Sequence, residues 1–304
     1  MHRLWQLPAV PVVSYMTMKT FFDKTVLYLR MIKISHSVFA LPFAFVGALL
    51  AAKGMPAFHE IFWIAVAMVG ARSGAMGLNR IIDRKIDADN PRTSKREIPA
   101  GKINVPEALF FTAISLGVLV FAAYKLNPLC FMLSPIAIGI LVLYSYTKRF
   151  TWASHFVLGL AISGAPLGAW IAVRGTFDAE IVPLAVAVIL WLAGFDILYA
   201  LQDIDFDRQH GLFSVPRRFG IEKSLIISRI LHGFTFGLFI ATGMIFHLNA
   251  WYFIGLVIIG VLLTYEHSLV KSNDLSKLNM AFFNMNGYIS ITILIFTFIS
   301  LISR

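Results

Sequence analysis

The chain has 304 residues, of which 58% are hydrophobic and only 14% are charged. Soluble domains carry about 25% charged residues, so the composition excludes an ordinary soluble protein and predicts an all-α polytopic membrane protein. The net charge of +10 would suit nucleic acid binding in a soluble protein. In a membrane protein it indicates basic cytoplasmic loops and attraction to anionic lipid, so we expect the lipid bilayer and no nucleic acid as partner.

The first 34 residues are predicted to form an N-terminal arm that ends in an interfacial helix. Pro8 and Pro11 interrupt the apolar sequence near the start, so we do not predict a signal peptide. Residues 21–34 mix charged and apolar side chains, a pattern typical of a helix that lies in the membrane interface. A single membrane domain is therefore expected over residues 35–304.

Nine apolar runs have the length that a transmembrane helix needs. They lie at roughly 35–53, 60–80, 106–125, 128–147, 152–173, 180–201, 225–246, 250–268 and 279–302. Most lysines and arginines fall in the arm and in the loops after the second, fourth, sixth and eighth runs. This asymmetry predicts nine transmembrane helices around a central cavity, with the N-terminus and these cap loops in the cytoplasm.

The second run ends in a row of polar side chains. Asn79, Asp83 and Asp87 stand four residues apart, which on a helix places their oxygen atoms along one stripe. A long loop of about 25 residues follows, rich in lysine and arginine. Long loops in a compact protein are usually functional.

The sixth run ends in a similar row and is also followed by a long loop. Tyr199, Asp203 and Asp207 repeat the spacing, whereas Asp205 lies off the stripe and is given no metal role. Clustered carboxylates favour hard cations, and Mg²⁺ typically takes one or two carboxylates together with phosphate oxygens. Together with Asp83 and Asp87, the second row predicts a Mg²⁺–diphosphate site. In the alternative, the acids pair with cations of their own loops on a solvated surface.

Other polar residues lie within or at the ends of apolar runs, where charge is costly and usually functional. Arg72 precedes Asn79 by two helical turns, and Asp196 precedes Asp203 in the same way, so both are expected to face the cavity. An ion pair between Arg72 and Asp196 with a structural role is the alternative. The fourth run ends in three polar residues that face the cavity or anchor the helix: Tyr144, Lys148 and Arg149.

Three histidines occupy separate apolar runs. His36, His155 and His232 lack the spacing of metal ligands. The pattern predicts hydrogen-bonded packing residues.

The two polar rows resemble the paired signatures of the UbiA superfamily of intramembrane prenyltransferases. The matching motifs are Asn79-x-x-x-Asp83-x-x-x-Asp87 and Tyr199-x-x-x-Asp203-x-x-x-Asp207. The resemblance extends over the nine runs, the two long loops and the Tyr144-Ser-Tyr-Thr-Lys148-Arg149 segment. The stretch from Asn79 to Gly101 is similar to the 4-hydroxybenzoate polyprenyltransferase-like branch, and also to relatives assigned to a menaquinone route.

This resemblance implies Mg²⁺-dependent transfer of a polyprenyl group from polyprenyl diphosphate to an aromatic hydroxy acid, in quinone biosynthesis at the cytoplasmic (inner) membrane. The implied metal ligands are Asp83, Asp87, Asp203 and Asp207. The implied diphosphate-binding residues are Asn79, Arg84, Lys85, Tyr144, Lys148 and Arg149. Residues assigned to the reaction are Asp196, which would orient or deprotonate the acceptor, Tyr199, and Arg72, which would bind its carboxylate.

Three other functions remain open at the level of sequence. The acceptor could be a dihydroxynaphthoate, or a sibling enzyme could act on a non-aromatic or porphyrin acceptor. A secondary transporter would place its acids near the bilayer midplane, whereas these acids cluster towards one face.

Overall fold

The computed structural model of the chain describes residues 24, 26–32 and 40–303. The predicted arm and His36 therefore lie mostly or wholly outside the described residues. The division into an arm and one domain stays a prediction.

Helices make up the described fold, and among the described residues the β-structure is limited to one bridge, between Lys271 and Asp274. In chain order the elements are α2 (Leu41–Ala52), α3 (Phe58–Ile82), α4 (Arg84–Asp89), α5 (Val105–Leu126), α6 (Pro128–Thr147), α7 (Ser154–Arg174), the 3₁₀ turn η2 (Ala179–Ile181), α8 (Val182–Ala200), the 3₁₀ turn η3 (Leu201–Asp203), α9 (Ile204–Gln209), α10 (Val215–Ile245), α11 (Ala250–Leu269), the π-helical turn η4 (Met280–Met285) and α12 (Asn286–Ile302).

Seven of the described helical segments are long and apolar enough to cross a membrane. They are α3, α5, α6, α7, α10, α11 and the segment Ala179–Gln209, which contains α8. At the first and ninth predicted runs, α2 and α12 are shorter apolar helices of 12 and 17 residues. The all-α membrane fold is confirmed, and the number of nine crossings stays a prediction.

Polar side chains at the helix starts explain several boundaries. Asn104 accepts a hydrogen bond from the backbone N–H of Glu107 (2.8 Å), and Asn127 accepts one from that of Cys130 (2.8 Å). Each satisfies a backbone donor that the first helical turn would otherwise leave without a partner. Ser214 starts α10 in the same way, with Pro216 in the first turn. As a result α10 begins about ten residues before the predicted apolar run.

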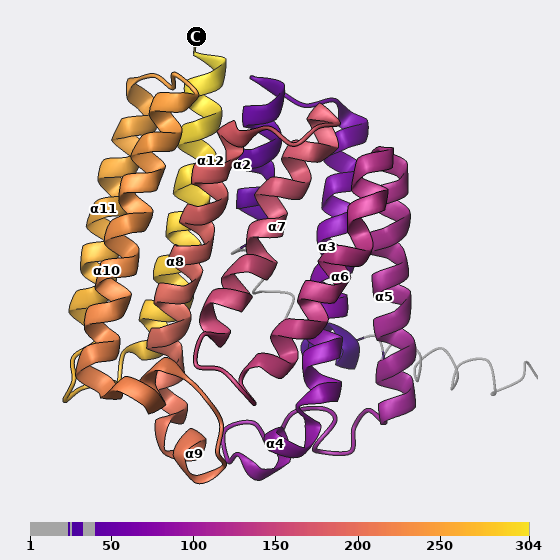
Figure 1. Cartoon of the computed structure of the whole chain (residues 1–304), viewed down its shortest axis with the longest axis vertical. Coiled ribbons are helices and arrows are strands. Elements are labelled where there is room, and N and C mark those ends of the chain that lie inside the picture. The colour runs from indigo at the N-terminus through magenta and orange to yellow at the C-terminus, as the bar shows by residue number, and fades with distance from the viewer. Residues whose placement is uncertain (1–23, 25, 33–39, 304) are drawn as a thin grey trace, which may run out of the picture.

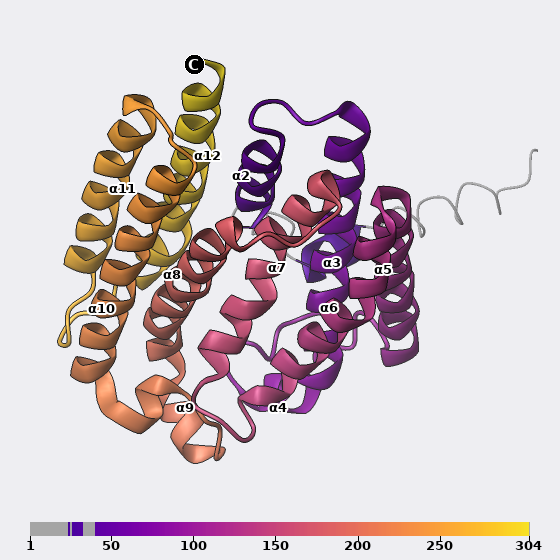
Figure 2. The same ribbon diagram turned by 45° about the horizontal axis from the view of Figure 1, so that its top comes forward.

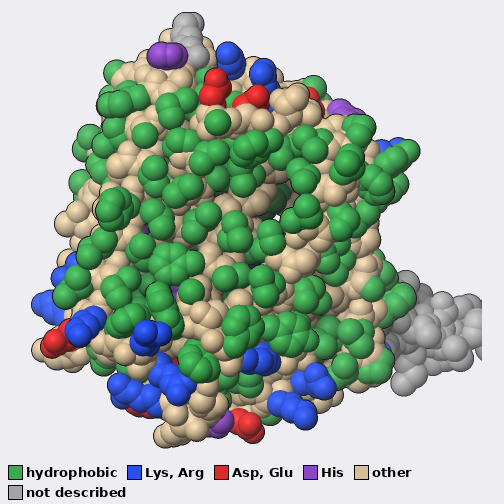
Figure 3. Space-filling view, viewed as in Figure 1, with side chains coloured by type: hydrophobic (Ala, Val, Ile, Leu, Met, Phe, Trp, Pro, Cys, Tyr) green, Lys and Arg blue, Asp and Glu red, His purple; other side chains and the backbone are tan. Residues whose placement is uncertain are grey.

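A shared core joins α2, α7, α8, α10, α11 and α12. Trp191 of α8 is fully buried and packs against Phe43 of α2, with ring centroids 5.0 Å apart, and against Phe195 at 4.8 Å. Large apolar side chains also cover the outside of the helices, as Figure 3 shows for one face. Such a surface suits lipid rather than water, and the chain is an integral membrane protein.

The short helices α4 and α9 lie next to each other at one end of the bundle, away from the C-terminus (Figures 1 and 2). Each follows a long membrane helix directly, α4 after α3 and α9 after α8 through η3. The two polar rows of the sequence fall at these junctions, so the fold brings them to the same end of the molecule.

Candidate functional site

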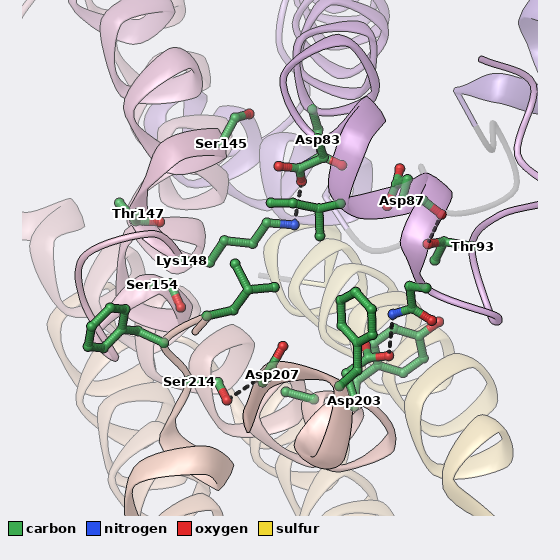
Figure 4. Close-up of a pocket in the computed structure, with 18 of the residues that line it drawn as sticks. Asp83, Asp87, Thr93, Ser145, Thr147, Lys148, Ser154, Asp203, Asp207 and Ser214 are labelled. Atoms are coloured by element: carbon green, nitrogen blue, oxygen red, sulfur yellow. Dashed lines mark hydrogen bonds and ion pairs between the residues drawn. The ribbon is translucent and has the colours of Figure 1, made fainter. Parts of the chain in front are cut away.

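A cavity opens between the two junctions and is lined by residues of α3, α4, α6, α7, α8, η3, α9 and the two long loops. Figure 4 shows carboxylates from both rows around it. The lining contains nine of the predicted site residues: Asn79, Asp83, Asp87, Tyr144, Lys148, Asp196, Tyr199, Asp203 and Asp207.

The first polar row keeps its helical spacing across a break in the helix. Asp83 ends α3, its backbone N–H donating to Asn79 O (2.9 Å), and its own carbonyl accepts from the N–H of Asp87 (2.8 Å). Asp83 and Asp87 are 1% and 3% exposed. These two acids are therefore buried rather than on a solvated surface.

The end of α6 supplies cations to Asp83. Lys148 Nζ lies 2.6 Å from its Oδ2 and Arg149 Nη2 lies 2.9 Å from its Oδ1. Asn79 Nδ2 also donates to Asp83 Oδ2, at 3.0 Å. Figure 4 shows Lys148 reaching across the cavity to this carboxylate. A buried carboxylate needs such partners because its desolvation is otherwise very costly.

Only one carboxylate oxygen of Asp87 has a cation at short range. Arg96 Nη1 lies 2.6 Å from its Oδ1, and Thr93 Oγ1 donates to its backbone carbonyl at 3.0 Å. Its Oδ2 is buried without a hydrogen-bond partner, and Arg80 Nη1 is 3.9 Å away. Asp87 therefore retains an oxygen that a metal ion could use.

Arg92 connects the first long loop to the second acidic row. Its Nε and Nη2 lie 3.0 and 2.5 Å from the two carboxylate oxygens of Asp203, and its Nη1 donates to Tyr199 Oη at 3.1 Å. Asn90 Nδ2 adds a hydrogen bond to Asp203 Oδ1 (3.1 Å). Burial opposes the charge of Arg92, but the contacts with Asp203 outweigh it and raise the pKa of the guanidinium.

Of the four carboxylates in the two rows, Asp207 is the one that no lysine or arginine of the described residues reaches within ion-pair distance. It is 9% exposed and accepts a hydrogen bond from Ser214 Oγ at 2.7 Å (Figure 4). One hydroxyl donor compensates only part of the charge of a buried carboxylate. A divalent cation would supply the missing positive charge.

Asp196 lies deeper in the cavity and has a histidine partner. His155 Nδ1 is 2.7 Å from Asp196 Oδ2. The alternative ion pair between Arg72 and Asp196 is absent from the described residues. Arg72 does not line the cavity, and its buried Nε has no hydrogen-bond partner.

Three further predicted residues lie outside the lining. Arg84 and Lys85 are exposed on α4, where positions one and two after Asp83 turn away from the stripe of the carboxylates. Arg84 instead donates to Ile81 O at 2.9 Å. Arg149 does not line the cavity, but it forms an ion pair with Asp83, which does. Asp205, on the opposite face of α9, is exposed beside Arg208.

The structure adds residues that the sequence did not assign to the site. Arg92 and Arg96 are two of several cations in the first long loop, and nothing in the sequence distinguishes them from the others. His155 is buried and hydrogen-bonded as predicted for a packing residue, but it lines the cavity. A histidine inside an apolar run was the available signal. His232 bonds His267 and Trp191 O and is buried, as a packing residue should be.

The carboxylates of the two rows suit Mg²⁺, provided that a ligand supplies further oxygens. The four row carboxylates offer only oxygen ligands, and Asp87 Oδ2 and Asp207 still need positive charge. However, no group of three His, Cys, Asp or Glu among the described residues is close enough to hold a metal ion alone. An ion bound here would need oxygens from a ligand as well, and phosphate groups commonly supply them.

The sequence model described as the UbiA prenyltransferase family matches residues 40–288, which is most of the chain. The chain belongs to the UbiA prenyltransferase family. It is therefore an enzyme, and the secondary transporter is not supported.

Several curated relatives of this chain have the name 4-hydroxybenzoate octaprenyltransferase. The protein of Vibrio atlanticus (strain LGP32) is 31% identical over 83% of this chain and 88% of its own length. That of Aliivibrio fischeri (strain MJ11) is 32% identical over 78% of this chain and 82% of its own length.

Solved structures of family members share the fold. An apo UbiA homologue from Aeropyrum pernix K1 superposes with a TM-score of 0.78 at 32% identity, covering 85% of this chain and 95% of that one. A UbiA homologue from Archaeoglobus fulgidus, bound to GPP and Mg²⁺, has a TM-score of 0.69 at 21% identity, covering 91% of this chain and 100% of that one. At that identity the second comparison supports the fold alone.

Proposed function

We propose that this UbiA-family enzyme transfers a polyprenyl group from a polyprenyl diphosphate to 4-hydroxybenzoate or a similar aromatic hydroxy acid, in quinone biosynthesis. The observation that carries the proposal is the pairing of two acidic rows around one cavity at the end of a membrane bundle, with Asp83, Asp87 and Asp207 buried. The names of the curated relatives support the choice of substrates.

The diphosphate is expected to bind between the two rows with Mg²⁺. Asp83 and Asp87 from one side, and Asp203 and Asp207 from the other, would hold the metal, with Asn79 beside Asp83. Bound Mg²⁺ would neutralise the diphosphate and favour its departure as a leaving group.

The cations that now pair with the carboxylates have a second task in this proposal. Lys148 and Arg92 line the cavity and contact Asp83 and Asp203. If these carboxylates held a metal, Lys148 and Arg92 would be free to hydrogen-bond to phosphate oxygens and to stabilise the charge that develops on the leaving group.

The transfer step breaks the allylic C–O bond, and its electron pair leaves with the diphosphate. The ring carbon ortho to the acceptor hydroxyl then forms a C–C bond with the allylic carbon. The proton lost from that ring carbon goes to a base, and Asp196 is the carboxylate on the deep side of the cavity that can take it. Tyr199 and Tyr144, which also line the cavity, are proposed to face the substrates.

The proposal is tested by supplying purified protein in lipid with Mg²⁺, a polyprenyl diphosphate and one acceptor at a time. Parallel reactions contain 4-hydroxybenzoate, a dihydroxynaphthoate or no acid, and products are identified by mass. We expect a prenylated hydroxybenzoate that disappears when EDTA removes the metal. Product from the dihydroxynaphthoate alone would favour the menaquinone alternative. The absence of a prenylated product with every acid would refute the proposed function.

We also propose that the cavity end faces the cytoplasm, with the chain in the inner membrane. Lys and Arg side chains gather at this end of the molecule (Figure 3). A Cys130→Ser, Lys95→Cys variant tests this, because Lys95 is exposed on the first long loop. An impermeant maleimide should label inverted vesicles and not right-side-out vesicles; the reverse pattern would contradict the orientation.

A further inference from the structure

The pairing of His155 with Asp196 carries an inference that rests on the proposed function and extends it to the acceptor side of the cavity. We propose that His155 is a positioning residue for the acceptor. In this role it holds the Asp196 carboxylate in one orientation towards the acceptor, while the backbone of Val215 holds His155.

The hydrogen bonds of His155 define which nitrogen carries the proton. The backbone N–H of Val215 donates to His155 Nε2 at 3.3 Å. Because an N–H can only donate, Nε2 must be the accepting nitrogen, and the proton of the neutral imidazole is on Nδ1. Nδ1–H then points at Asp196 Oδ2, 2.7 Å away.

This arrangement leaves one side of the Asp196 carboxylate for a ligand. Among the described residues, His155 is the hydrogen-bond partner of Asp196, and it occupies Oδ2. Asp196 lines the cavity with a side chain 21% exposed, whereas the His155 side chain is 4% exposed. The histidine is thus too enclosed to contact much substrate itself, and it acts through the carboxylate.

The anchor of His155 is fixed by the second acidic row. Ser214, directly before Val215, accepts a hydrogen bond from the N–H of Arg217 (3.3 Å) and so caps α10. The Ser214 hydroxyl also donates to Asp207 Oδ2 at 2.7 Å. Two neighbouring residues therefore contact Asp207 on the diphosphate side and His155 on the acceptor side. The orientation of Asp196 is tied to the position of the metal-binding row.

Two substitutions of His155 distinguish a role in positioning Asp196 from a role in stabilising the fold. The amide nitrogen of Asn can replace Nδ1 and keep the donor to Asp196, while the longer Gln places its amide near Nε2 and loses that donor. We expect His155→Gln to lower kcat/KM for the acceptor about 10- to 100-fold, since small misplacements of a reacting group cost about that much. His155→Asn should stay within about 3-fold of wild type, and both should keep the KM for polyprenyl diphosphate.

A second pair of variants tests the anchor without touching the histidine. Val215→Pro removes the N–H donor at the first position of α10, where proline is favoured. Val215→Ala keeps that donor and serves as its control. We expect Val215→Pro to lower kcat/KM for the acceptor several-fold more than Val215→Ala, with thermal unfolding in detergent used to match the two for stability.

The outcomes separate this inference from the proposed function. If wild type prenylates an aromatic acid and His155→Gln matches it, the positioning role is wrong. The role is also wrong if Asn and Gln are equally impaired, or if the KM for polyprenyl diphosphate rises in parallel with that for the acceptor, because a structural role would affect both. If wild type prenylates no acid at all, the proposed function itself has failed.

Discussion

Individual carboxylates in this cavity differ in how their charge is compensated. Asp83 has two cations and an amide, Asp203 shares the guanidinium of Arg92, and Asp207 has only a hydroxyl donor. On Asp83 and Asp203 cations contact both carboxylate oxygens, whereas Asp87 Oδ2 and Asp207 have no cation at short range that a metal would replace. The lysine and arginine side chains that pair with these carboxylates can therefore change partner when a ligand binds.

Lys148 should matter through this redirected charge. We expect Lys148→Met to lower kcat about 100-fold or more, because one donor aimed at developing charge is worth about that factor. The lysine is 31% exposed and Arg149 still pairs with Asp83 in its absence, so the fold should persist. Product formation under saturating substrates measures the effect. A near-normal kcat would contradict a role for Lys148 at the leaving group.

Local spacing made the row carboxylates predictable, since residues four apart share a helix face. The same reasoning could not find the partners of these acids. Arg92 and Asp203 are 111 residues apart, and His155 and Asp196 are 41 apart, so only the packing of separate elements brings them together. Arg84 and Lys85 show the converse: they are near the acids in sequence, but the start of α4 turns them outwards.

At the scale of elements, Arg92 fastens the first long loop to the α8–α9 junction. Arg92 makes two contacts with Asp203 and a third with Tyr199. A lysine has a single ammonium group and cannot reproduce all three. We expect Arg92→Lys to raise amide hydrogen exchange over residues 90–100 while α5 and α8 stay protected. The exposed Lys95→Ala is the matched control on the same loop. Unchanged exchange in Arg92→Lys would show that other contacts hold the loop.

Helices α3 and α5 pack closely because of glycine. A Cβ at Gly70 would lie 2.7 Å from the backbone nitrogen of Leu119 and 2.8 Å from the carbonyl of Ser115. Gly70→Ala should therefore destabilise the fold by about 1–3 kcal/mol, the usual cost of overpacking. A Cβ at Gly117 meets nothing within 4 Å, so Gly117→Ala should be neutral or stabilising. Melting in detergent compares the two; equal losses would contradict the close packing.

Helix boundaries were less predictable than helix positions. Hydropathy starts the seventh apolar run only at residue 225, because Arg217, Arg218 and Lys223 lie just before it. A separate helical segment starts at Val215 and ends at Gly220, where φ is 80° and ψ is 173°, and the long helix follows it. The charged residues interrupt the apolar pattern, but the cap at Ser214 still starts a helical segment before it. This segment matters, since it places Ser214 at the cavity and the N–H of Val215 against His155 Nε2.

For the whole molecule, the structure unites features that the sequence keeps 120 residues apart. Two membrane helices each continue into a short helix, and both short helices meet at one end of the bundle (Figures 1 and 2). The acids lie at that end around one cavity, where the first long loop supplies Arg92 and Arg96 and the end of α6 supplies Lys148. The central claim is that this cavity activates a polyprenyl diphosphate through carboxylates from both rows.

One measurement tests that claim most directly: prenyl transfer by Asp83→Asn, Asp203→Asn and Asp205→Asn proteins matched for expression. Asp205 is the control, because it lies on the same short helix as Asp207 with its side chain 83% exposed. We predict at least a ~100-fold loss for the first two variants, since each removes a charge from the metal–diphosphate site. Asp205→Asn should match wild type. Near-normal transfer by both Asp83→Asn and Asp203→Asn would contradict the account.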